Sequence, residues 1–143
     1  MAAELIPKTV LLLFLGAAAF MDINMRQIPV LLPAGVFAAG LILKLAFAGA
    51  IWWQILLGCV PGLVLILAGY LSRQAVGYGD GLVFIACGPF LGIINNLFLL
   101  FISLVLAALF SMAALALGKM RLRSAFAFIP FILGAYVFLL AVS

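Results

Sequence analysis

The run LFLLFISLVLAALFSMAALAL, residues 97–117, contains no charged side chain and is long enough to cross a lipid bilayer as one helix. Its apolar residues follow one another without the alternation of a half-buried strand. A segment in lipid must satisfy its own backbone hydrogen bonds, which a helix does and an isolated strand does not. The run therefore predicts a membrane protein built from helices.

The composition of the whole chain agrees with this run. Of its 143 residues, 71% are hydrophobic and 7% are charged, and the mean hydropathy is +1.54. Soluble domains are roughly 45–50% apolar and about 25% charged. We therefore expect an all-α, polytopic transmembrane bundle, with residues 1–143 forming a single domain. Its surroundings are then the lipid bilayer, and no nucleic acid partner is expected.

Polar links divide the chain into about six candidate spans: residues 5–21, 30–48, 52–71, 82–94, 97–117 and 125–142. The fourth span would rise only about 20 Å, less than the roughly 30 Å of the hydrocarbon core. We still expect a tight turn at Asn95 and Asn96, because one helix over residues 82–117 would be about 54 Å long.

The basic residues predict how these spans are oriented. Five lie in the first, third and fifth links and two lie on the opposite side: Arg26, Arg73, Lys119, Arg121 and Arg123 against Lys8 and Lys44. The positive-inside rule places the three basic links in the cytoplasm. Asp22 closes the first span and Asp80 opens the fourth, so both acids are expected at the cytoplasmic edge. With five spans the cluster at residues 119–123 would face outward, but the two acids would still share a side.

The chain has three acidic residues, and two of them, Asp22 and Asp80, lie where an apolar run meets a polar link. Ionisable groups beside membrane spans are costly and therefore suggest a function. Two carboxyl groups held close together do not both ionise cheaply, so one keeps its proton. The charged group can take a proton from an attacking water while the other donates to a peptide carbonyl oxygen. This chemistry needs no cofactor.

Other kinds of catalytic, metal or phosphate site need residues or spacings that this sequence does not have. The chain has no histidine, which removes Ser-His and Cys-His nucleophiles and His-rich metal sites. Cys59 and Cys87 form no CxxC pair, so we expect small buried side chains and no metal. No serine and lysine have a convincing spacing for a catalytic dyad. No GK[ST] follows the glycines near Asp80, so a phosphate loop is not predicted.

Three glycines surround the second acid in the sequence Gly77-Tyr78-Gly79-Asp80-Gly81. Glycine reaches positive φ and lets another backbone come close. We expect this segment to be a link that admits a peptide substrate beside Asp80, with Gly77 and Gly79 making room for it. A flexible turn before a helix would explain the glycines equally well.

These motifs resemble a known family. Gly77-Tyr78-Gly79-Asp80 matches the GxGD signature of intramembrane aspartic proteases. Asp22 followed by Ile28-Pro29 resembles the D-x5-I-P-N motif of type IV prepilin peptidases, and the likeness covers essentially the whole chain. It implies an aspartic endopeptidase of the inner membrane that cleaves the short basic leader from prepilins or pseudopilins at the cytoplasmic face. Asp22 and Asp80 would be the catalytic pair, with no metal or cofactor, and either could be the base.

The chain departs from that family at a few positions. Val30 stands where the family often has Asn, and Leu82 where it often has Lys, which puts substrate preference in more doubt than catalysis. Larger members carry a cytoplasmic segment with paired cysteines and methylate the new N-terminus. Nothing in this sequence resembles that segment, so we expect a peptidase without methyltransferase activity. Presenilin and signal peptide peptidase share GxGD but carry a Pro-Ala-Leu motif that is missing here.

Alternatives to a peptidase use the same acids. They could form a proton or cation relay in a small transporter, although a relay is expected near the midplane. They could instead cap helix ends in a structural subunit, although Asp22 at a helix C-terminus is poorly placed for this. A separate alternative is that the first span is a cleaved signal peptide, because residues 16–19 are small residues of the kind that a signal peptidase prefers. Glu4 argues against this, since the N-terminal segment of a signal peptide is normally positively charged.

Small residues and prolines predict how the bundle packs. Two glycine pairs have GxxxG spacing, which favours close packing within the chain over dimerisation: Gly58 with Gly62 and Gly88 with Gly92. Three prolines lie inside candidate spans and predict kinks: Pro61, Pro89 and Pro130. The sequence predicts no oligomeric state.

Overall fold

The structure, a computed structural model, describes residues 2–25, 30–49, 52–71, 78–118 and 128–142. These residues form α1 (Ala2–Met25), α2 (Leu31–Leu43), the π-helical turn η1 (Lys44–Ala48), α3 (Trp52–Gly58), α4 (Val60–Leu71), α5 (Tyr78–Ala116) and α6 (Ile129–Val142). No strand occurs among them. The prediction of an all-α fold is confirmed.

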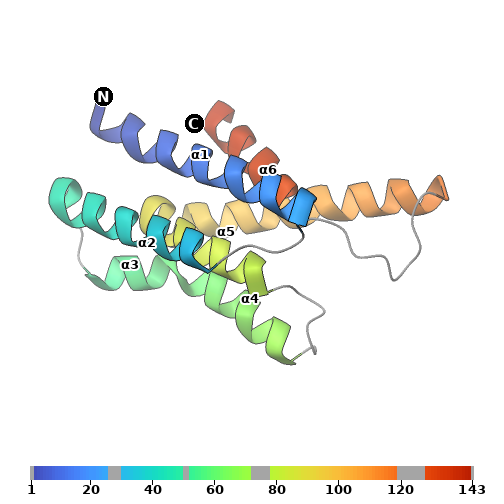
Figure 1. Cartoon of the computed structure of the whole chain (residues 1–143), viewed down its shortest axis with the longest axis horizontal. Coiled ribbons are helices and arrows are strands. Elements are labelled where there is room, and N and C mark those ends of the chain that lie inside the picture. The colour runs from blue at the N-terminus through green and yellow to red at the C-terminus, as the bar shows by residue number, and fades with distance from the viewer. Residues whose placement is uncertain (1, 26–29, 50–51, 72–77, 119–127, 143) are drawn as a thin grey trace.

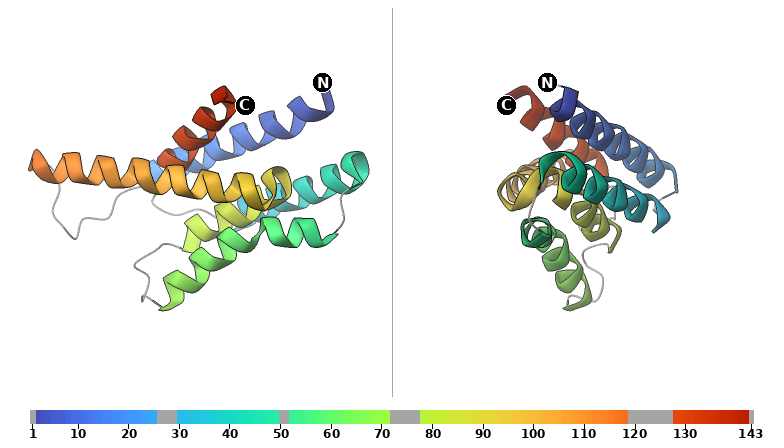
Figure 2. Two further views of the ribbon diagram at one scale, coloured as in Figure 1. Left: turned by 180° about the vertical axis from the view of Figure 1, so that it is seen from behind. Right: turned by 90° about the vertical axis from the view of Figure 1, so that its left-hand side faces the viewer.

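Helix α5 lies at the centre of the bundle and contacts α1, α2, α3, α4 and α6. Figures 1 and 2 show three layers, in which α1 lies with α6, α2 with α5, and α3 with α4. The main core lies where α1, α5 and α6 meet. Its largest fully buried side chains are Leu11, Leu15, Val83, Phe84, Leu99, Ile129, Ile132 and Tyr136.

The outer surface carries many large apolar side chains, as expected for a protein in lipid. Leu31 is 84% exposed, and Leu13, Phe20 and Trp52 are each about 70% exposed. A soluble monomer rarely exposes apolar patches this extensive. By length and composition alone, two helical segments, Leu5–Asn24 and Gly79–Ala116, suffice to cross a membrane, although the second is interrupted at Gly92, and the bent pair of α3 and α4 would add a third. The described helices thus fit a membrane protein, but the count of six spans is not confirmed.

The predicted span over residues 52–71 corresponds to α3 and α4, which meet at an angle of 41°. Pro61 lies just after the bend and lacks the N–H that would continue the helical hydrogen bonds, so the predicted kink is confirmed here. The kink predicted at Pro130 is wrong. Pro130 is the second residue of α6, where a missing N–H costs little because the first turn has no helical acceptor.

Helix α5 folds back on itself at Gly92, which has φ 76° and ψ 174°. The Nδ2 of Asn96 donates a hydrogen bond to the Phe84 carbonyl oxygen over 3.0 Å, although twelve residues of straight helix would separate them by about 18 Å. Figure 2 shows the resulting first arm, residues 78–91, and second arm, residues 93–116. The turn predicted at Asn95 and Asn96 is therefore misplaced. The chain reverses at Gly92, because glycine tolerates positive φ.

Asn96 stabilises the reversal of α5 by hydrogen bonds. Its fully buried Nδ2 donates to the carbonyl oxygen of Gly58 over 2.7 Å as well as to that of Phe84. We expect Asn96→Leu to lower the free energy of unfolding by about 1–3 kcal/mol, because buried acceptors lose their donor. The exposed neighbour gives a matched control, and Asn95→Leu should change that free energy by less than about 0.5 kcal/mol. Denaturant unfolding in one detergent measures both; equal losses would contradict the assigned role.

Glycines let α3 and α4 pack directly on the first arm of α5. A Cβ at Gly58 would lie 2.5 Å from the Gly88 carbonyl oxygen, and one at Gly62 would lie 2.5 Å from the backbone nitrogen of Ile85. Close packing within the chain is therefore confirmed for Gly58, Gly62 and Gly88. Gly92 does not take part in this packing, since a Cβ there would meet nothing within 4 Å. Its positive φ lets the chain reverse.

Candidate active site

Asp80 lies in the first turn of α5, partly buried. The backbone N–H groups of this turn form the positive end of the helix dipole. The next residue, Gly81, packs on α4, where an added Cβ would lie 2.5 Å from Cγ1 of Ile66 and 3.1 Å from the Gly62 carbonyl oxygen. The close contact between α4 and α5 therefore fixes the position of Asp80.

The glycine-rich segment differs in part from its prediction. Gly79 and Gly81 were expected in an irregular link, but both lie in α5, and neither has positive φ. The backbone that approaches Gly81 closely belongs to α4. Gly77 lies outside the described residues, as do Ile28 and Pro29 of the first motif and the five basic residues of the predicted cytoplasmic links.

Asp22 lies in the last turn of α1, also partly buried. Its Oδ2 accepts a hydrogen bond over 3.3 Å from the backbone N–H of Ile129, the first residue of α6. Sequence reasoning missed this contact because a backbone donor has no side-chain signature. Pro130 was the available signal, since proline in the first turn marks a helix start.

The structure brings the two acids together. Asp22 in the last turn of α1 and Asp80 in the first turn of α5 lie at one end of the bundle, where the charge of Asp22 affects Asp80. Repulsion between two nearby carboxylates disfavours the state in which both are charged. A pair with one protonated and one charged carboxyl group is what acid–base hydrolysis requires.

The contact with Ile129 also gives Asp22 a structural role. The sequence argued against a helix-capping Asp22 because the residue ends its own helix. In the structure it caps a different helix, by accepting an N–H at the N-terminus of α6. Catalysis and capping must therefore be separated by experiment.

The cysteines lie in the bundle, as predicted, and both are buried and free. The thiol of Cys59 donates to the Ile85 carbonyl oxygen over 3.7 Å. That oxygen lacks its usual helical donor because the residue four positions on is Pro89. In the described part of the chain, no three His, Cys, Asp or Glu side chains are grouped so that they could hold a metal ion.

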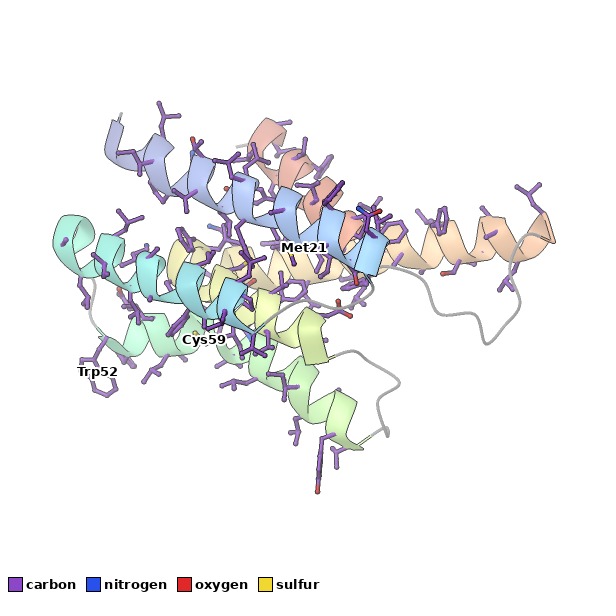
Figure 3. All side chains as sticks on the ribbon, in the orientation of Figure 1. Met21, Trp52 and Cys59 are labelled. Atoms are coloured by element: carbon purple, nitrogen blue, oxygen red, sulfur yellow. The ribbon has the colours of Figure 1, made fainter. Side chains whose placement is uncertain are left out.

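A cleft of about 330 Å³ lies away from the two acids. Its lining includes Lys44, Gln54, Gly92 and Asn95, at the far ends of α2 and of the first arm of α5. Figure 3 labels Met21, the neighbour of Asp22, and Trp52 of α3, and shows them at separate parts of the bundle. Neither acid lines this cleft, so the cleft is not part of the candidate site.

Comparisons with known proteins point to one family. A family model described as the type IV leader peptidase family matches residues 9–112. This range holds both acids, all of α2, α3 and α4, and most of α5. No curated protein and no solved structure matches the chain.

Proposed function

The chain belongs to the type IV leader peptidase family, and we propose that it is an aspartic endopeptidase whose catalytic pair is Asp22 and Asp80. The observation that carries this proposal is the placement of both acids at one end of the bundle, with Asp22 in the last turn of α1 and Asp80 in the first turn of α5, close enough for the charge of Asp22 to affect Asp80. The family match supports a peptidase and gives no support to the alternative of a transporter.

The reaction needs a water molecule and the scissile peptide between the two carboxyl groups. The charged carboxylate takes a proton from the water while the oxygen of that water bonds to the carbonyl carbon. The other carboxyl group donates its proton to the carbonyl oxygen, which gives a neutral tetrahedral intermediate. When the C–N bond breaks, the first carboxyl group returns its proton to the leaving nitrogen, and the second takes back a proton from the hydroxyl that becomes the new carbonyl.

The substrate we propose is a prepilin or pseudopilin with a short basic leader. The apolar segment that follows the leader would lie in the bilayer, while the scissile bond reaches the acids at the membrane edge. Gly77 and Gly79 are proposed to leave room for the substrate backbone beside Asp80. We propose that this edge faces the cytoplasm from the inner membrane in a chain that crosses about six times, and the excess of basic residues in the first, third and fifth links supports this orientation.

Processing of a prepilin tests this proposal. The purified chain in lipid vesicles is incubated with candidate prepilins, and the product is sequenced from its new N-terminus. Release of the leader at its border with the apolar segment is the expected result. Intact prepilins together with proton-linked flux across the vesicle membrane would instead favour a transporter.

Chelators should leave the cleavage rate unchanged. The proposed proton transfers use carboxyl groups alone, and the chain has no histidine and three acidic residues from which a metal site could be built. Cleavage is compared with and without EDTA, at equal ionic strength. Activity that is lost in EDTA and restored by a divalent metal would contradict the two-carboxyl mechanism.

A further inference from the structure

Asp22 receives its hydrogen bond from a residue 107 positions later in the chain. Its carboxyl group sits in the last turn of α1, where the negative end of that helix's dipole disfavours an anion. The donor, the N–H of Ile129, belongs to the first turn of α6, whose dipole has the opposite sign there. Helix α6 therefore offsets an unfavourable position in α1.

The first turn of α6 leaves one backbone donor for this bond. Pro130 has no N–H, and the N–H groups of Phe131 and Ile132 both bond to the carbonyl oxygen of Phe128, over 2.9 and 3.4 Å. The N–H of Ile129 remains and bonds to Asp22. The first turn thus directs a single donor at the carboxyl group.

The donor is held rigidly relative to α1. Ile129 and Ile132 are fully buried in the core. Farther along α6, the hydroxyl of Tyr136 donates to the Lys8 carbonyl oxygen over 3.1 Å. The two helices are therefore joined by hydrogen bonds at two separate points, which restricts how the carboxyl group of Asp22 can turn.

We propose that the N-terminus of α6 is a positioning element for catalysis, in which the N–H of Ile129 orients Asp22 and holds it as the charged member of the pair. A hydrogen bond from N–H to a carboxylate is stronger than one to a neutral oxygen, so it favours the charged form. Asp22 is then the base and Asp80 the proton donor. This inference rests on the proposed peptidase function. Ile129 lies outside the matched residues 9–112, so a helix beyond the family match completes the site.

Replacing the amide of residue 129 by an ester tests the positioning role. Nonsense suppression with the α-hydroxy analogue of isoleucine removes this N–H and keeps the side chain. We expect kcat to fall roughly 10- to 100-fold per folded molecule, with KM unchanged, because the bond orients a reacting group and does not bind substrate. The control Ile129→Val keeps the N–H, so its loss of kcat per folded molecule should be much smaller than that of the ester and measures the part due to side-chain packing.

Two outcomes would overturn this role. The first is an ester variant whose kcat is unchanged or in which only KM is raised. The second is a loss of kcat in Ile129→Val as large as that in the ester variant, which would assign the effect to side-chain packing. If the unmodified chain cleaves no prepilin, the peptidase function itself fails and this inference fails with it.

A stability measurement that needs no substrate tests the charge of Asp22. The ester is introduced at residue 129 both in the unmodified chain and in Asp22→Asn, and the folding equilibrium constant is measured with and without it. The ester should lower this constant about tenfold more in the unmodified chain, because the side-chain amide oxygen of Asn is a neutral acceptor. Equal effects in the two backgrounds would show that Asp22 does not carry the charge, and would overturn the assignment of Asp22 as the base.

Discussion

Asp22→Asn and Asp80→Asn should each reduce leader cleavage by on the order of 10³-fold or more, while the protein still inserts and folds. Each change removes a proton acceptor or donor from the pair and keeps the size of the side chain. The oxygen of an Asn at position 22 can still accept the N–H of Ile129, so the cap on α6 is preserved. Cleavage of a prepilin in vesicles, normalised to folded protein, measures the effect.

The third acid of the chain provides the control. Glu4→Gln also removes a carboxyl group and should change cleavage by less than about twofold, since Glu4 has no proposed part in the reaction. Full activity in folded Asp22→Asn would mean that Asp22 serves as a cap for α6 and not as a catalytic group. The same result for Asp80→Asn would remove that residue from the mechanism.

Gly62→Ala should separate α4 from α5 and displace Asp80. The added Cβ would lie 2.5 Å from the Ile85 nitrogen and 2.6 Å from the Gly81 carbonyl oxygen, and backbone atoms cannot move aside as a side chain can. We expect the free energy of unfolding to fall by about 1–3 kcal/mol. Cleavage should fall roughly 100-fold, because a shift of about 1 Å in a reacting group has effects of that size.

Gly16→Ala is the matched control in α1, because a Cβ there meets nothing within 4 Å. Replacing a helical glycine by alanine without a clash should raise the free energy of unfolding by about 0.5–1 kcal/mol. The two substitutions are therefore expected to change stability in opposite directions. If both raise it alike, the contact between α4 and α5 does not restrain Asp80.

The sequence was sufficient for the features that depend on composition and local chemistry. Continuous apolar runs predict helices in lipid, and the bend beside Pro61 follows from a missing N–H. The positions where apolar runs meet polar links predict that Asp22 and Asp80 share a membrane edge, and in the structure the two acids lie in the last turn of α1 and the first turn of α5, where the charge of Asp22 affects Asp80.

The remaining features depend on contacts between distant segments. The reversal of α5 lies between two apolar runs without periodicity, so the pattern could not distinguish Gly92 from the polar Asn95 and Asn96 as its position. Glycine spacing predicted close packing but not the partner of each glycine. The bond from Ile129 to Asp22 uses a backbone donor, and nothing in the side-chain pattern identifies it.

The central claim, that the two acids meet, can be tested most directly by cross-linking. In a background with Cys59→Ala and Cys87→Ala, the pair Asp22→Cys and Asp80→Cys is treated with a short bifunctional thiol reagent in vesicles, and the product is identified by mass. The control pairs Asp22→Cys with Lys44→Cys, since Lys44 lies where α2 ends, far from the end of α1 (Figure 1). We predict an intramolecular cross-link between positions 22 and 80 and none in the control. Positions 22 and 80 that each react with a monofunctional reagent, yet never become linked, would contradict the account.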